Sequence, residues 1–262
     1  MSEEITKNEH THAIWEDRYK IHSYEIDTKS QVSLVAIGHY LQEAAWNHVH
    51  AIQLDFDYLI GKNQIWVLSR MLIKMEKYPK WGDTIYIQTW AKGLDRLFAL
   101  REFLILGEDK AIIGRVSATW LVIDTINRRP QRLNSMSEIM TIMSEKQALK
   151  EKLGRLPPVV SNKNYSFFPV RYSDLDMNGH VNNVKYIEWV LDNYSTEIIK
   201  AYEIKAFQIN YLAESTYGDE VAIQSQKLDG FGLVFLHSAV RRKDNCEIFR
   251  VRTEWKKDEK TG

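Results

Sequence analysis

Acidic, amide and imidazole side chains crowd one short stretch of the 262-residue chain, DLDMNGHVNN at 174–183. If this stretch is extended, alternate side chains lie on the same face, so Asp176, Asn178 and His180 share one side. Carboxylate and imidazole groups can take up and release protons, and an amide can donate to a carbonyl oxygen. The pattern that follows predicts a helix, whose first unpaired N–H groups suit a carbonyl oxygen becoming an oxyanion. These residue types at this spacing therefore favour acyl chemistry.

A purely structural explanation of the same stretch has to be weighed beside the chemical one. Asp, Asn and Gly are common in turns and at helix ends. Gly179 permits backbone conformations that are closed to other residues, and Asn182 or Asn183 is a good N-terminal cap for the following helix. The pattern alone leaves a structural network and a functional site equally open.

The elements around this stretch occur twice in the sequence. From Gly82 to Trp120 is 38 residues and from Gly218 to Trp255 is 37, and similar segments start and end both intervals. Each interval begins with a Gly-Asp turn that enters a strand, and it ends with an Arg-Val pair followed by a tryptophan. The paired segments are 82–90 with 218–226 and 114–120 with 249–255.

Each half also predicts a helix upstream of its Gly-Asp turn and further strands downstream. Apolar residues recur there in steps of three and four, which is typical of one buried helix face. They are Leu34, Ile37, Leu41, Ala45 and Ile52 in the first half, and Val184, Ile187, Leu191, Tyr194 and Ile198 in the second. Strand-like runs follow at 97–106 and 233–240. The fold class is therefore α+β, with one helix covering an antiparallel sheet in each half.

The segment between the halves stands outside the repeat. We predict a helix from Ser135 to Leu153, which Gly154 and the following prolines end. The predicted organisation is an N-terminal unit at 1–130, a linker with a helix at 131–164 and a C-terminal unit at 165–262. The first strand of the C-terminal unit is expected near Tyr165.

The motif DLDMNGHVNNVKY at 174–186 resembles the signature of acyl-ACP thioesterases. The resemblance continues through WVLSR at 66–70, WLVID and RRP within 120–130, and AES near 214. It implies a tandem (double) hot-dog fold of the bacterial type, in which each antiparallel sheet wraps around a long central helix. It also implies hydrolysis of fatty acyl-acyl carrier protein (ACP), which releases free fatty acid and holo-ACP in fatty acid biosynthesis.

The resemblance also indicates which residues form the site. Asp176, Asn178 and His180 fall on the family's Asp-x-Asn-x-His motif, and Glu214 falls on a glutamate from the following strand. The next position is often cysteine in plant members but is Ser215 here, which argues against an obligatory cysteine nucleophile. No cofactor or metal is implied, because the phosphopantetheine arm of ACP carries the acyl group.

Two mechanisms fit these four residues. In the first, Glu214, or His180 as second candidate, takes a proton from water while Asn178 and backbone N–H groups polarise the carbonyl. Asp176 would hold the neighbouring donors in place. In the second, the carboxylate of Asp176 or Glu214 attacks the thioester directly and forms a transient anhydride.

The first half shows no such triad when the two halves are matched at Tyr40 and Tyr186. That match places Ser30, Val32 and Leu34 opposite the three motif residues. By resemblance, we expect the N-terminal half to hold the acyl chain in an apolar pocket between its sheet and helix.

Charge and composition restrict the partners. Thirty-five basic residues balance 35 acidic ones, so no overall field favours nucleic acid or an anionic membrane. The chain starts with a polar segment and has no apolar run of membrane-spanning length, which predicts a cytoplasmic protein without membrane insertion. An acidic carrier would need a local basic patch, for which there are two candidates: Arg128, Arg129 and Arg132, or Arg241, Arg242 and Lys243.

Several alternatives stay open at this point. The wider hot-dog motif does not choose the carrier, so an acyl-CoA thioesterase is the nearest enzyme alternative. A non-catalytic protein that binds acyl chains or carriers is a different class. Exposed sheet edges could pair two chains into a homodimer.

Overall fold

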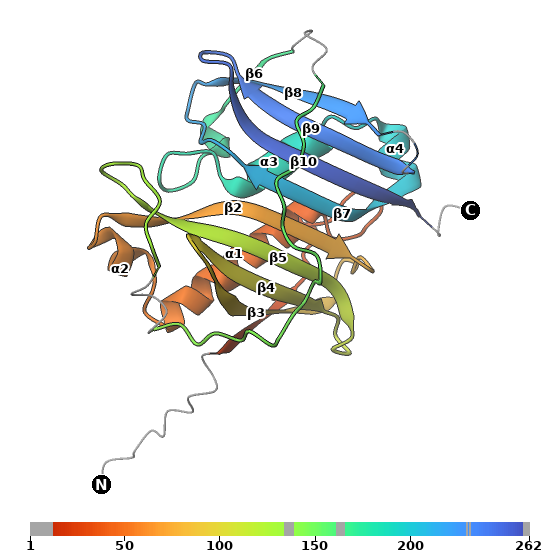
Figure 1. The fold of residues 1–262 in the computed structure, drawn as a ribbon. Coiled ribbons are helices and arrows are strands. Elements are labelled where there is room, and N and C mark those ends of the chain that lie inside the picture. Colours follow the sequence, from red (N-terminus) through yellow and green to blue (C-terminus); the bar gives the residue numbers. More distant parts are fainter. Residues whose placement is uncertain (1–12, 134–138, 161–165, 229, 231, 259–262) are drawn as a thin grey trace.

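The described part of the chain forms one continuous antiparallel sheet. The structure is a computed structural model that describes residues 13–133, 139–160, 166–228, 230 and 232–258. Within these residues ten strands are hydrogen-bonded in the order β1-β3-β4-β5-β2-β7-β10-β9-β8-β6, and α1 and α3 lie on the same face of the sheet (Figure 1).

The two halves contain corresponding elements. The N-terminal half has β1 (Ile14–Lys20), α1 (Leu34–Ala51), α2 (Phe56–Ile60), β2 (Gln64–Met75), β3 (Thr84–Asp95), β4 (Phe98–Leu106) and β5 (Ile112–Asp124). The C-terminal half has β6 (Phe168–Pro169), the 3-10 turn η2 (Tyr172–Asp174), α3 (Asn183–Leu191), α4 (Thr196–Ala201), β7 (Tyr202–Tyr211), β8 (Glu220–Lys227), β9 (Leu233–Arg241) and β10 (Cys246–Lys257).

The strand order confirms the predicted α+β tandem hot-dog. Counted outward from the centre of the sheet, β7, β10, β9, β8 and β6 of the second half correspond to β2, β5, β4, β3 and β1 of the first. At the centre β2 pairs with β7, from Arg70 opposite Asn210 to Lys74 opposite Ala206. The predicted Gly-Asp turns precede β3 and β8, and their glycines have φ of 85° and 79°. Glycine is the default residue there because positive φ is closed to most side chains.

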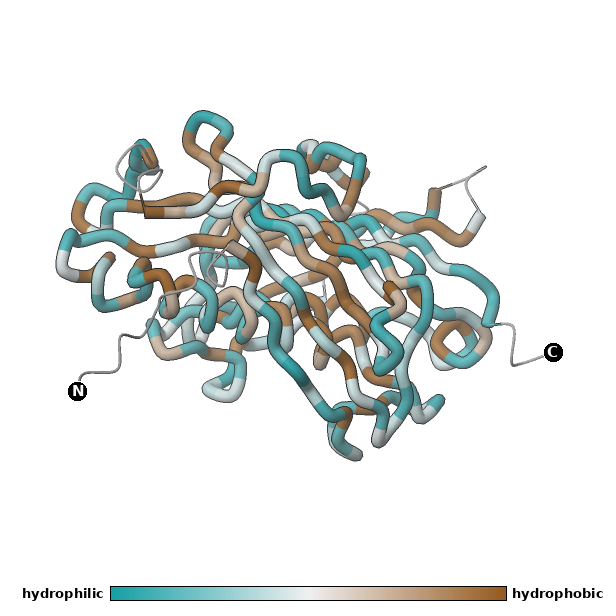
Figure 2. Tube along the Cα trace, turned by 90° about the horizontal axis from the view of Figure 1, so that it is seen from below, coloured by the Kyte–Doolittle hydropathy of each residue, from teal (hydrophilic) through white to brown (hydrophobic). Residues whose placement is uncertain are grey.

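The core lies between the sheet and the two helices, which cross at Gly38. A Cβ atom at Gly38 would lie 3.1 Å from a methyl carbon of Val184 and 3.2 Å from one of Ile187, so the missing side chain lets α1 and α3 approach. Figure 2 shows apolar segments along the strands and helices and hydrophilic segments at many of the turns. Among the described residues, no helix combines the length and apolar character that a membrane span needs.

The single helix predicted for the second half is wrong. α3 ends at Leu191 and a separate helix, α4, begins at Thr196, so Tyr194 lies between them. The physical reason is the polar run between the helices: the side chain of Asn193 donates to the carbonyl of Trp189 at 2.6 Å, competing with backbone bonds.

The helix predicted at Ser135 to Leu153 is also wrong over 139–153, and 134–138 lie outside the described residues. This segment instead crosses the sheet on the face opposite the helices (Figure 1), and sheet side chains satisfy its backbone. Glu102 accepts from the N–H groups of Ala148 and Leu149 at 2.8 and 3.2 Å, and Arg70 donates to the Leu153 carbonyl at 2.8 Å.

The strand expected near Tyr165 is shorter than the sequence suggested. It begins at Phe168 and has two residues, and Tyr165 itself lies outside the described residues. The edge of the sheet next to β8 is therefore covered over a short stretch, where Phe168 pairs with Val221.

Candidate active site

The loop before α3 is a tight turn, so the predicted extended alternation is wrong. Asp176 accepts from the N–H groups of Asn178 and His180 at 2.8 and 3.2 Å, and its own N–H donates to the carbonyl of His180 at 2.7 Å. Gly179 has φ of 75°. An aspartate that accepts from the N–H two residues ahead favours a turn over a strand. The turn, and not strand periodicity, brings the motif residues together.

The helix entrance is capped as the sequence predicts. Asn182 is the N-cap of α3, and its side-chain oxygen accepts from the N–H of Val184 at 2.9 Å. The N–H of Asn182 donates to the carbonyl of Asp174 at 2.9 Å, and Asp174 is buried. The start of α3 is therefore held against the turn that carries Asn178.

Glu214 lies in the loop after β7, and not on a strand as predicted. The loop is held in place by the N–H of Val181, which donates to the carbonyl of Ser215 at 2.8 Å, and by Arg241, which donates to the carbonyl of Glu214 at 2.6 Å. One carboxylate oxygen of Glu214 lies 3.5 Å from Nε2 of His180. The same oxygen forms an ion pair with the guanidinium of Arg128.

All four predicted residues line one cavity of about 330 Å³: Asp176, Asn178, His180 and Glu214. Arg128 and Tyr186 line it too. The structure thus brings the four predicted residues together, although Asp176 and Glu214 lie 38 positions apart, and it adds Arg128, 86 positions before Glu214. Within the described residues, no group of three or more His, Cys, Asp or Glu side chains could hold a metal ion.

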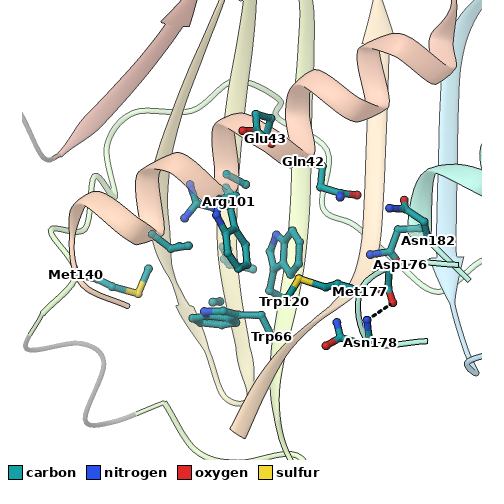
Figure 3. A pocket seen from close by; sticks show the side chains of 16 residues that line it. Gln42, Glu43, Trp66, Arg101, Trp120, Met140, Asp176, Met177, Asn178 and Asn182 are labelled. Carbon is teal, nitrogen blue, oxygen red and sulfur yellow. Dashed lines mark hydrogen bonds between the residues drawn. The ribbon is translucent and has the colours of Figure 1, made fainter. Parts of the chain in front are cut away.

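A second, more apolar pocket of about 390 Å³ adjoins the first cavity. Asp176, Asn178, Asn183 and Trp66 line both. Figure 3 shows Trp66, Asp176 and Asn178 around the second pocket. Its other walls come mainly from α1 and from the strands of the N-terminal half, with Ala45, Val49, Ala99, Leu100 and Trp120. A polar head group bound at the motif could therefore extend an apolar tail into the N-terminal half.

Arg101 is a buried charged side chain in the wall of this pocket, and the sequence offered no signal for it. It hydrogen-bonds to His48 Nδ1 at 2.9 Å and to Thr89 at 3.1 Å. Burial lowers the pKa of Arg101 to about 10, so its guanidinium stays charged at neutral pH.

Neither candidate sulfur or hydroxyl nucleophile faces the site. Ser215, next to Glu214, is fully buried and lines neither cavity. Cys246 starts β10, and its thiol lies 3.7 Å from the backbone carbonyl of Glu247.

The N-terminal half contains the same turn, three positions away from the predicted match. Asp27 accepts from the N–H groups of Lys29 and Gln31 at 2.8 and 3.1 Å, and its N–H donates to the carbonyl of Gln31 at 2.7 Å. Ser30 has φ of 59°, and Ser33 caps α1. The offset between the halves is therefore 149 residues here, from Asp27 to Asp176.

The predicted match of Ser30, Val32 and Leu34 to the motif is consequently wrong in register. A shift of three residues is close to one helical turn, so it preserves the apolar face on which the match was based. The counterparts of Asp176, Asn178 and His180 are Asp27, Lys29 and Gln31. The first half keeps the aspartate and lacks the asparagine and the histidine.

Comparisons with known proteins cover both halves. The sequence models of two domains match the chain: the acyl-ACP thioesterase N-terminal domain at residues 12–142 and the acyl-ACP thioesterase C-terminal domain at residues 159–257. A chloroplastic palmitoyl-acyl carrier protein thioesterase of Arabidopsis thaliana is 30% identical over 267 residues, which cover 92% of this chain and 64% of that protein. The chain thus spans less than two thirds of this relative. The chloroplastic oleoyl-acyl carrier protein thioesterase 2 of the same plant is 28% identical and covered over 77% of its length.

Solved structures share the architecture. An acyl-ACP thioesterase from Bacteroides thetaiotaomicron aligns with a TM-score of 0.85 and 26% identity, over 93% of this chain and 98% of that one. A 12:0-ACP thioesterase from Umbellularia californica has the same fold, with a TM-score of 0.83 and 22% identity over 94% and 98% of the two chains. Family models that span both halves, together with this shared fold, show that the chain belongs to the acyl-ACP thioesterase family.

Proposed function

We propose that this chain hydrolyses the thioester of fatty acyl-ACP and releases free fatty acid and holo-ACP in fatty acid biosynthesis. The observation that carries the proposal is the continuity of two cavities, one lined by Asp176, Asn178, His180 and Glu214 and the other largely apolar. The names of the relatives, which are thioesterases of palmitoyl- and oleoyl-acyl carrier protein, support the same substrate class.

Glu214 is the base in the proposed reaction. Its carboxylate takes a proton from water, and the water oxygen attacks the thioester carbon. Asn178 and the positive end of the α3 helix dipole stabilise the resulting oxyanion. When the intermediate collapses, the carbon–sulfur bond breaks and the leaving thiolate takes the proton from Glu214. His180, 3.5 Å from Glu214, orients the carboxylate and is the alternative base.

Asp176 holds the turn in this mechanism. One of its oxygens already accepts two backbone N–H groups, which makes it a poorer nucleophile than a free carboxylate. Direct attack, if it occurs, is therefore assigned to Glu214. Single turnover in ¹⁸O water tests for the anhydride: label in the Glu214 carboxylate establishes it, because water that attacks the thioester carbon directly leaves no label in the protein.

The acyl chain occupies the apolar pocket of the N-terminal half, and the phosphopantetheine arm of ACP presents the thioester. The proposed chemistry uses side chains of this protein and requires neither a cofactor nor a metal.

Free thiol release from acyl-ACP across chain lengths tests the proposal, with Glu214→Gln as the inactive control. Turnover by the wild type together with a loss of about 10²-fold or more in the variant is the expected result for removal of a general base. Matched acyl-CoA substrates decide the carrier, since faster hydrolysis of CoA thioesters would replace ACP with CoA. Stoichiometric acyl-ACP binding without thiol release would indicate a non-catalytic binding protein.

A further inference from the structure

Arg128 is a residue of the N-terminal half that reaches the candidate base of the C-terminal half. It lies in the turn that follows β5, and its guanidinium forms an ion pair with Glu214, 86 residues away in sequence. Arg128 also lines the cavity that contains Asn178, His180 and Glu214. A basic patch for carrier docking, which the sequence suggested for Arg128, does not by itself explain a contact inside this cavity.

The backbone of the turn presents Arg128 independently of the ion pair. Asp124 accepts from the N–H groups of Ile126 and Asn127, both at 2.9 Å, and its carbonyl accepts from the N–H of Arg128 at 2.9 Å. Arg128 itself has φ of 57°, as Arg96 and Lys110 have φ of 57° and 62° in the turns before β4 and β5, so this backbone conformation belongs to the turn. The turn's own hydrogen bonds therefore hold the backbone from which the Arg128 side chain reaches Glu214.

The ion pair is a weak source of stability. The Arg128 side chain is 54% exposed and that of Glu214 is 32% exposed. Ion pairs this open to water stabilise a fold by at most about 1 kcal/mol, and often by nothing measurable. An arginine that lines the cavity beside a candidate base and adds little stability is thus better explained by chemistry than by folding.

We propose that Arg128 is a catalytic residue that binds the substrate carbonyl oxygen as negative charge leaves Glu214. The inference rests on the proposed thioester hydrolysis. As the water O–H bond breaks, its proton goes to Glu214, the water oxygen bonds to the carbonyl carbon and the carbonyl electron pair moves onto oxygen. Negative charge therefore moves from the carboxylate to the oxyanion inside one cavity.

A guanidinium suits this charge movement because it carries five N–H donors in a fixed planar fork. One donor can stay on Glu214 while another meets the carbonyl oxygen, so the positive charge faces the negative charge before and after proton transfer. When the carbon–sulfur bond breaks, the thiolate takes the proton from Glu214 and the ion pair with Arg128 is restored.

Steady-state kinetics of Arg128→Met, Arg128→Lys and Arg96→Met test this role. Arg96 is the matched control because it is an exposed arginine with φ of 57° in the turn between β3 and β4, and it lines neither cavity. Each variant is assayed with acyl-ACP and with the acyl-N-acetylcysteamine thioester of the same chain, which has no carrier. Thermal melting compares the folds.

The expected result is a fall in kcat of about 10²-fold for Arg128→Met on both substrates, as for removal of one oxyanion donor, with little change in KM. Arg128→Lys should lose about tenfold, because lysine keeps the charge without the fork. Arg96→Met should match the wild type.

Three outcomes would overturn the proposal. The first is an unchanged kcat in Arg128→Met. The second is a defect confined to the KM for acyl-ACP, which would indicate carrier docking. If Arg128→Met fails to fold, wild-type kcat in Arg128→Lys is the third. Failure of the proposed function is distinguishable from all of these, because the wild type would then release no thiol from either substrate.

Discussion

Two turns with the same backbone have diverged in chemistry. The turn at 27–33 and the turn at 176–182 share an aspartate that accepts two N–H groups, a residue with positive φ at the fourth position and a side-chain cap on the following helix. Only the second places a histidine beside a glutamate. The aspartate is therefore part of the fold in both halves, and the histidine and asparagine occur in only one of the two turns.

The space in front of each turn differs as well. In the N-terminal half Lys29, the counterpart of Asn178, donates to the carbonyl of Tyr202 at 2.7 Å and lies 3.5 Å from the buried carboxylate of Asp258. The C-terminal half leaves the corresponding space as the cavity of about 330 Å³. In the N-terminal half the protein's own residues occupy the space in front of the turn, whereas in the C-terminal half this space is a cavity.

Between the sheet and the helices the two halves differ in the opposite sense, because here the N-terminal half has the open space and the C-terminal half is filled. Ala99 pairs with Trp120 and Leu233 pairs with the equivalent Trp255, so Ala99 and Leu233 are counterparts. By the offset of 149, Ala45 corresponds to Tyr194, whose ring lies 4.6 Å from that of Trp255. Small residues leave the apolar pocket open in the N-terminal half, and larger ones fill the corresponding space in the C-terminal half. Each half thus provides one of the two adjoining cavities.

The largest expected effect comes from giving the active turn the residue of its counterpart. His180→Gln copies Gln31, and we expect kcat on acyl-ACP to fall by about 10²- to 10⁴-fold, the usual contribution of a group that acts in proton transfer. The melting temperature should change little, because the turn uses only the backbone of His180. Retention of more than half of the wild-type kcat would show that the His180 side chain takes no part in the reaction.

Replacing the shared aspartates separates folding from catalysis. Asp27→Ala and Asp176→Ala each remove an acceptor of two backbone N–H groups, so each should lower the free energy of unfolding by about 1–3 kcal/mol in urea titrations. Only Asp176→Ala should also lower kcat, since it releases Asn178 and His180. Equal kinetic losses in both variants would contradict the distinction between the two turns.

A buried histidine should make stability depend on pH. His237 pairs with Val251 where its counterpart Phe103 pairs with Val116, and burial lowers the pKa of His237 to about 3. Below its unfolded pKa of about 6.5 the unfolded chain binds a proton that the folded protein does not, so stability falls as pH falls. From this group we expect a loss of about 2 kcal/mol between pH 7 and pH 5.

His237→Phe, which copies the first half, provides the comparison. The loss of unfolding free energy between pH 7 and pH 5 should be smaller in the variant by about that 2 kcal/mol. Identical pH dependence in the variant and the wild type would show that His237 is not responsible.

The smallest expected effect concerns the pocket. Ala99→Leu copies Leu233 and fills part of the acyl pocket, so the preferred chain should become shorter. Each methylene that no longer fits forfeits about 0.8 kcal/mol, or about fourfold in kcat/KM. Assays across acyl-ACP lengths check this, with the shortest chain as the internal control. A uniform loss at all lengths would place the pocket elsewhere.

Much of the fold could be predicted from the sequence because it rests on short-range patterns. Alternation and helical periodicity identified the strands near the repeated segments and the helix at 34–51, and cap chemistry identified Asn182. The break between α3 and α4 was missed because apolar periodicity continues through it to Tyr194 and Ile198, while polar side chains interrupt the backbone. The helix predicted in the linker failed because sheet residues such as Glu102 and Arg70 satisfy its backbone instead.

The sequence by itself determined the repeat, the strands and the grouping of Asp176, Asn178 and His180 near one helix entrance, because these depend on neighbours a few residues apart. Only the tertiary structure decided the shape of the turn, the register between the halves, the opening of one interior and the meeting of Arg128 with Glu214. Those features depend on contacts between residues far apart in the chain. Local periodicity carries no information about such contacts, since helices and strands keep the same pattern whatever packs against them.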